Sequence, residues 1–211
     1  MDIPDKIKYI IEQILKREDR WKALYMAVWG CSYYLENEFR QKRPELWDQV
    51  VPLGLPGSKK KQHPYKPSEL HSILRSFDAE ITIIHLVILF VLLEELLNES
   101  SLIFYGKRLD TGHLENLKAF LEGSDVSDIL SEVEKKELFL AKATRNCFIH
   151  NGSKIDQRWI NAYQFARSAP PIKKIGDDVK KAFTSMLYQV EDWHELIIKI
   201  TKGVKEKIKG K

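Results

Sequence analysis

The chain has 211 residues, 44% of them hydrophobic and 30% charged, which is enough to bury a core and ordinary for a soluble globular protein. Its formal net charge of +4 is compatible with an anionic partner but excludes the large basic excess of histone-like or tail-like binding. The two cysteines, Cys31 and Cys147, have no CxxC neighbour, which excludes a cysteine-type zinc site made by this chain alone.

The N-terminal part of the chain has helical periodicity. Its first apolar stripe predicts a helix with Pro4 near the start and the following residues on one face: Ile7, Ile10, Ile11, Ile14 and Leu15. Residues 21–39 continue this helix or follow a short break. Residues 51–67 are rich in proline and glycine and predict a loop, after which Ser68 is a plausible N-cap.

The most apolar part of the chain is residues 76–99. The apolar run within it, residues 81–93, is shorter than the roughly 20 residues that cross a bilayer, so no membrane partner is expected. Acidic residues on both sides favour a central bundle helix. The β-branched residues also allow a strand, but the sequence offers no partner strand.

Four helices are expected in the second half, at residues 113–122, 126–150 and 157–168 and from Asp177 onward. Ser124 or Asp125 is the expected cap of the second one. Residues 202–211 are expected to be a frayed, solvated tail. The pattern predicts one all-α domain over residues 1–211. Residues 1–5 do not resemble a signal peptide and a cytoplasmic, reduced location is expected, although a Cys31–Cys147 disulfide stays open.

Chemistry is concentrated in residues 143–152, at the end of the expected 126–150 helix. Arg145 can bind a phosphate with two parallel hydrogen bonds, and His150 can transfer protons near neutral pH. Asn146 adds an amide, and Asn151-Gly152 ends the helix. An imidazole that removes the proton of a ribose 2′-OH and a cation that stabilises the charged phosphorus suffice to cut RNA without a metal.

This segment resembles the Arg-x(4–6)-His motif of the HEPN superfamily (higher eukaryote and prokaryote nucleotide-binding), in which a polar residue such as Asn146 commonly follows the arginine. The resemblance implies a HEPN-like helical bundle with additional helices, forming a homodimer whose two motifs meet at the two-fold axis. It also implies a metal-independent endoribonuclease without cofactor, acting as a toxin or anti-phage defence effector. RNA and an antitoxin protein would then be its partners.

In this interpretation Arg145 stabilises the transition-state charge, His150 transfers protons, and Asn146 positions the phosphate or Arg145. Two alternatives stay open. In the first, the chain is a non-catalytic module that binds nucleotides, RNA or proteins. In the second, Arg145 and His150 are ordinary residues of a helix end. Roughly one match to the bare spacing is expected by chance. The Arg108–His113 match, which has leucine after the arginine and spans a glycine turn, is interpreted as that chance match.

The spacing raises a geometric difficulty. Five residues on an ideal helix turn through about 140°, so Arg145 and His150 would not share a face. Either the helix ends or tightens near Ile149, or a second copy completes the site.

Other residues are weaker candidates for a functional site. Lys59, Lys60 and Lys61 would hold the RNA backbone, unless their loop is simply solvated, and Asn151 is a further substrate-binding candidate. His85 is either a buried, hydrogen-bonded core residue or faces the Arg145 site. Asp78 and Glu80 either orient the site or favour a helix start. No acidic spacing indicates a metal, so no metal site is expected.

Overall fold

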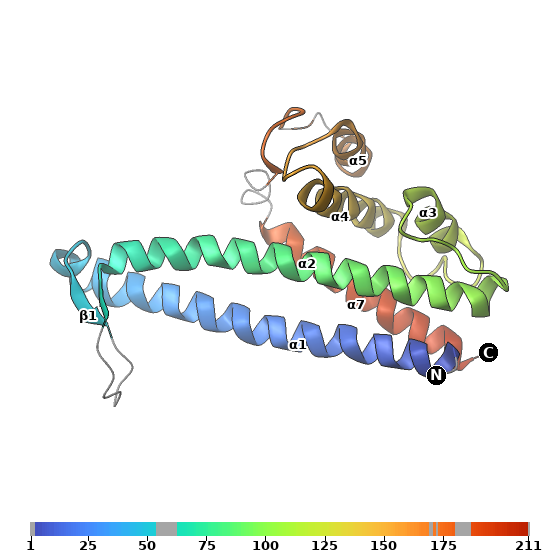
Figure 1. Ribbon diagram of the computed structural model, residues 1–211, viewed down its shortest axis with the longest axis horizontal. Helices are drawn as coiled ribbons and strands as arrows, with labels where there is room; N and C mark the ends of the chain where they lie inside the picture. Colours follow the sequence, from blue (N-terminus) through green and yellow to red (C-terminus); the bar gives the residue numbers. More distant parts are fainter. Residues whose placement is uncertain (1–2, 54–62, 169–170, 172, 180–186, 211) are drawn as a thin grey trace. The chain divides into compact units, whose positions relative to one another are not determined.

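The computed structural model describes residues 3–53, 63–168, 171, 173–179 and 187–210, and this part of the chain is mostly helical (Figure 1). The prediction of an all-α protein is thereby confirmed. Two compact units can be distinguished. A large unit comprises Met1–Asp19 and Ile83–Lys211, and a small unit comprises Arg20–Thr82. Helices α1 (Ile3–Leu35) and α2 (Pro67–Tyr105) each contribute to both.

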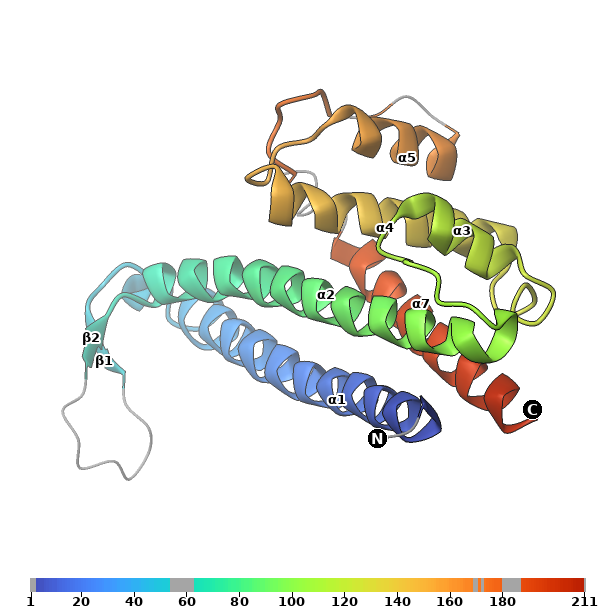
Figure 2. The ribbon, with the colours of Figure 1, turned by 45° about the vertical axis from the view of Figure 1, so that its right-hand side comes forward.

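The large unit is completed by four helices, α3 (Leu114–Glu122), α4 (Glu132–His150), α5 (Gln157–Arg167) and α7 (Leu187–Lys209), seen from two sides in Figures 1 and 2. Within this unit, α2 is the apolar helix expected of residues 81–93, and no residue of that run is a strand. It supplies much of the core through the buried residues Leu86, Leu89, Phe90, Leu93 and Leu96. No described helix combines the length and apolarity needed to cross a membrane.

Helix α4 begins later than predicted, at Glu132 rather than near residue 126. The actual cap is Ser131, whose side chain accepts a hydrogen bond from the Glu134 amide at 3.3 Å while the Glu134 carboxylate accepts one from the Ser131 amide at 2.8 Å. This reciprocal pair satisfies two amides that a helix start leaves without partners. The caps expected at Ser124 and Asp125 were wrong, because residues 124–130 form turns.

Helices α5 and α7 are both tied to α4 by one carboxylate, that of Glu137. The Arg167 guanidinium on α5 binds both oxygens of Glu137, and the Trp193 indole N–H on α7 donates to it at 3.2 Å. The planar guanidinium matches a carboxylate with two parallel hydrogen bonds, which fixes orientation as well as distance. The helix that carries the predicted motif is therefore held from two sides by side-chain hydrogen bonds.

The C-terminal end differs from the expected frayed tail. Helix α7 continues to Lys209, Val204 is fully buried and Ile208 packs against the core. The lysines at positions 202, 205, 207 and 209 lie on the solvated side of an amphipathic helix. A count of charges along the chain does not show that the same segment has a buried apolar side. The final helix was expected to begin at Asp177, but residues 180–186 lie outside the described part of the chain.

The small unit contains the end of α1, a π-helical turn η1 (Glu36–Gln41), a 3₁₀ turn η2 (Pro44–Leu46) and the start of α2. Residues 21–35 thus continue the first helix without a break. The expected 51–67 loop is in part an antiparallel pair, β1 (Val51–Leu53) and β2 (His63–Tyr65), in which Pro52 is opposite Pro64. Both strands of a two-stranded ribbon are edges, where proline's missing N–H is tolerated.

Candidate functional site

Arg145 is held inside the large unit rather than presented to solvent. Only 12% of its side chain is exposed. One guanidinium nitrogen donates to the Asn146 side-chain oxygen at 2.9 Å, and another lies 3.7 Å from a carboxylate oxygen of Glu94 on α2. Its Nε is buried and has no hydrogen-bond partner among the described residues. Asn146 therefore contacts the Arg145 guanidinium directly, and its predicted role toward a phosphate or Arg145 stays a prediction.

Glu94 binds a second cation. The Lys142 ammonium lies 3.3 Å from the other Glu94 oxygen and donates to the Thr111 carbonyl at 2.5 Å. Lys142 is almost completely buried, and this burial lowers the pKa of its ammonium, while the charge of Glu94 acts in the opposite direction. Sequence analysis missed this ion pair, because Glu94 is far from Lys142 and Arg145 along the chain.

His150 is the last residue of α4 and is exposed. Within the described part of the chain, its side chain makes no hydrogen bond or ion pair. Helix α4 keeps its α-helical geometry as far as His150, so of the alternatives considered for this spacing, a tightening of the helix near Ile149 is not found. Five helical steps separate Arg145 and His150 by about 140° around the axis. One chain therefore presents the two side chains on different faces of α4.

The backbone turns sharply after His150. Gly152 and Ser153 both have left-handed backbone angles, with φ of +55° and +66°, and the Ser153 amide returns to the Cys147 carbonyl at 2.9 Å. Such a C-terminal turn satisfies a carbonyl that the helix end leaves free. The sequence Asn151-Gly152 predicted this stop.

Asp156 organises the segment between α4 and α5. Its carboxylate accepts hydrogen bonds from the Asn151 amide at 2.8 Å, from the Trp159 backbone N–H at 2.9 Å and from Arg158 at 2.9 Å. Burial raises the pKa of this carboxyl, but the hydrogen bonds outweigh burial and leave the pKa below its usual value. Asn151, predicted to bind substrate, uses its amide N–H to hold this turn.

Two glycines are expected to respond oppositely to alanine. Gly152→Ala should destabilise the protein by about 1 kcal/mol, because a Cβ disfavours the left-handed angles found there. Gly30→Ala, at an exposed position in the last third of α1 with nothing within 4 Å of the added Cβ, should stabilise it by about 0.5 kcal/mol. Thermal denaturation of the two variants measures both signs. Equal changes of stability in the two variants would mean that the turn after His150 can adopt other backbone angles at no cost.

The remaining candidate residues do not join this site in the described structure. Lys59, Lys60 and Lys61 lie outside the described residues. Arg108 pairs with the buried Glu99, and the exposed His113 lies 3.3 Å from Asp110, so both residues of the second Arg-x4-His match have carboxylate partners of their own. Of the two acidic residues before the apolar run, Glu80 is exposed, and the side chain of Asp78 lies outside the described part.

His85 is buried and hydrogen-bonded, as one of its two interpretations predicted. Its Nε2 lies 3.2 Å from a carboxylate oxygen of Glu18, and His194 completes a group whose potential ligand atoms all lie within 4.8 Å of one another. Spacing along the chain gives no signal for this group, because its members come from three separate helices. Cys31 and Cys147 are both free, so the disulfide is excluded.

Comparison of the chain with models of protein families, with curated proteins and with solved structures gave no match.

Proposed function

We propose that the protein is a metal-independent endoribonuclease of the HEPN type, with its site at the C-terminal end of α4. The observation that supports this is the division of roles within one helix end. Arg145 is oriented by Glu94 and Asn146, whereas His150, little more than one turn later, is exposed and makes no side-chain hydrogen bond or ion pair with the described residues. An oriented cation and an accessible imidazole are the two groups that metal-free RNA cleavage needs.

The reaction follows from these groups. The His150 imidazole accepts the proton of a ribose 2′-OH, and that oxygen attacks the adjacent phosphorus. The bond to the 5′ oxygen of the next nucleotide breaks, and a protonated imidazole supplies the proton which that oxygen takes up. Arg145 stabilises the extra negative charge on the phosphate in between. The products carry a 2′,3′-cyclic phosphate and a 5′-hydroxyl, and DNA is not a substrate because it lacks the nucleophile.

A homodimer resolves the geometric difficulty. Because Arg145 and His150 lie on different faces of α4, the proposed site takes a second copy of the chain, with two motifs around one phosphodiester. A two-fold axis places the same surface of each copy against the other, so both histidines can face the same substrate. The resemblance further suggests a toxin or defence effector, held inactive by an antitoxin protein.

A non-catalytic nucleotide-, RNA- or protein-binding module is the second candidate. The specific observation in its favour is that Arg145 is mostly buried and already faces a carboxylate. A guanidinium whose charge is balanced by Glu94 has less to gain from a transition-state phosphate. Such a module would bind its ligand without turnover.

The test uses purified protein and end-labelled RNA in EDTA, with circular dichroism to verify folding under the same conditions. We expect cleavage that ends in cyclic phosphate and falls about 10²–10⁴-fold in His150→Ala. His113→Ala, which removes the histidine of the second Arg-x4-His match, is the matched control and should cleave normally. Cleavage that persists in His150→Ala or requires added metal would refute the proposal. Binding without products would favour the second candidate.

A further inference from the structure

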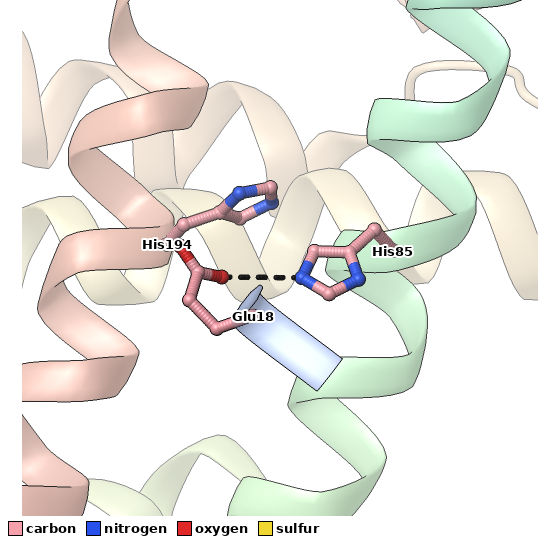
Figure 3. A group of neighbouring side chains, drawn as sticks. All are labelled: Glu18, His85 and His194. Atoms are coloured by element: carbon pink, nitrogen blue, oxygen red, sulfur yellow. Dashed lines mark hydrogen bonds and ion pairs between the residues drawn. The ribbon is translucent and has the colours of Figure 1, made fainter. Parts of the chain in front are cut away.

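Three helices of the large unit direct polar side chains to one buried point (Figure 3). Glu18 comes from α1, His85 from α2 and His194 from α7. Their exposed fractions are 4%, 7% and 1%. A carboxylate and two imidazoles are costly to remove from water unless each is bound by another group. The three side chains form one buried polar cluster.

The distances suit a small ion. One potential ligand atom from each residue lies within 4.8 Å of the other two, and the His85 Nε2 to Glu18 Oε2 distance is 3.2 Å. Zinc bonds of about 2.0–2.1 Å in tetrahedral geometry place neighbouring ligand atoms about 3.3–3.4 Å apart. The three ligand atoms define three of the six edges of such a tetrahedron, and one of these edges is already close to this length. The fourth vertex is left for a water molecule.

We propose that Glu18, His85 and His194 bind one divalent transition-metal ion, with zinc as the reference ion. Two imidazoles and one carboxylate match the preference of zinc and its first-row neighbours, whereas magnesium and calcium prefer sites made of oxygen atoms. The ion would take the place of the hydrogen bond between His85 Nε2 and Glu18, with the single N–H of the neutral imidazole carried on Nδ1 instead.

The burial of the ligands assigns the ion a structural role. It would join α1, α2 and α7 at one point, and it is separate from the Arg145 and His150 chemistry, which needs no metal. The alternative is a metal-free cluster. In that arrangement His85 and Glu18 share a hydrogen bond, and the His85 and His194 rings pack edge to face, with their centroids 4.9 Å apart.

The experiment is a Co²⁺ titration of the full-length protein, followed by visible absorption and then by displacement with Zn²⁺. We expect one ion per chain, absorption bands of a four- or five-coordinate nitrogen–oxygen site, and loss of these bands when zinc is added. Zinc should also raise the melting temperature, because it binds the folded state alone. These readouts do not depend on RNA cleavage, so failure of the proposed function would leave them unchanged.

Glu18→Gln should weaken Co²⁺ binding by at least about 100-fold, because it removes the charged ligand with little change of shape. His113→Ala is the matched control, since it removes an exposed histidine that also lies near a carboxylate, Asp110. It should bind cobalt as the wild type does. If Glu18→Gln does not fold, the wild-type spectrum alone decides. Absence of the bands, or bands and thermal shift that persist in a folded Glu18→Gln, would overturn the proposal and leave the metal-free cluster.

Discussion

Glu94→Ala is expected to destabilise the protein by roughly 3–5 kcal/mol, because it leaves a buried ammonium without its counter-charge. Lys142 is only 2% exposed, and Glu94 is the carboxylate 3.3 Å from it. The same substitution removes the carboxylate that faces Arg145. Chemical denaturation at pH 7, followed by circular dichroism, measures the loss.

Two further variants test whether the unpaired charge of Lys142 causes this loss of stability. Glu95→Ala removes the neighbouring carboxylate on the same helix, which is 44% exposed and lies 3.4 Å from Lys6 at the surface. It should change stability by less than about 0.5 kcal/mol. Adding Lys142→Met to Glu94→Ala should recover much of the loss, because an apolar chain needs no counter-charge. No recovery would show that the unpaired charge is not the cause.

Trp159→Ala should cost about 3–5 kcal/mol, as expected for removing a large side chain from a close-packed core. The Trp159 ring is completely buried, stacks on Tyr163 at a centroid distance of 5.2 Å, and donates its indole N–H to the Thr144 hydroxyl on α4 at 2.9 Å. It therefore fastens α5 to the helix that carries the motif. Guanidinium denaturation gives the free energy of unfolding directly.

Phe165→Ala is the matched control for Trp159→Ala. It removes an aromatic ring from the same helix, but that ring is 50% exposed and stacks on Phe139 at 6.5 Å. We expect a loss of about 1 kcal/mol or less. If the two substitutions had similar effects, packing of α5 onto α4 would not depend on the buried tryptophan.

Much of the helical fold could be predicted because periodicity is a local signal. The apolar run at residues 81–93 indicated a buried helix, and residues 157–168 gave α5 almost to the residue. The error at the start of α4 occurred where several local signals competed. Ser124, Asp125 and Ser131 are all acceptable caps, and only Ser131 has the glutamate three residues later that closes the reciprocal pair.

The candidate site was predictable only where it is contiguous. Arg145, Asn146 and His150 share one helix end, as their positions in the sequence require, although Arg145 and His150 lie on different faces of α4. Glu94 reaches Arg145 only through the packing of α2 against α4, and the Glu18, His85 and His194 cluster depends on three helices meeting. Such pairings are set by tertiary structure, and one sequence carries no direct record of them.

The Asp156 carboxylate makes the turn between α4 and α5, beside His150, resistant to unfolding by acid. Because its pKa in the folded protein lies below its ordinary value of 3.8, its ionised form stabilises the fold at every pH above that value. This contribution disappears only as the pH falls through the lower folded-state pKa. A change in the proposed RNA cleavage between pH 5 and 8 would therefore not be caused by protonation of Asp156.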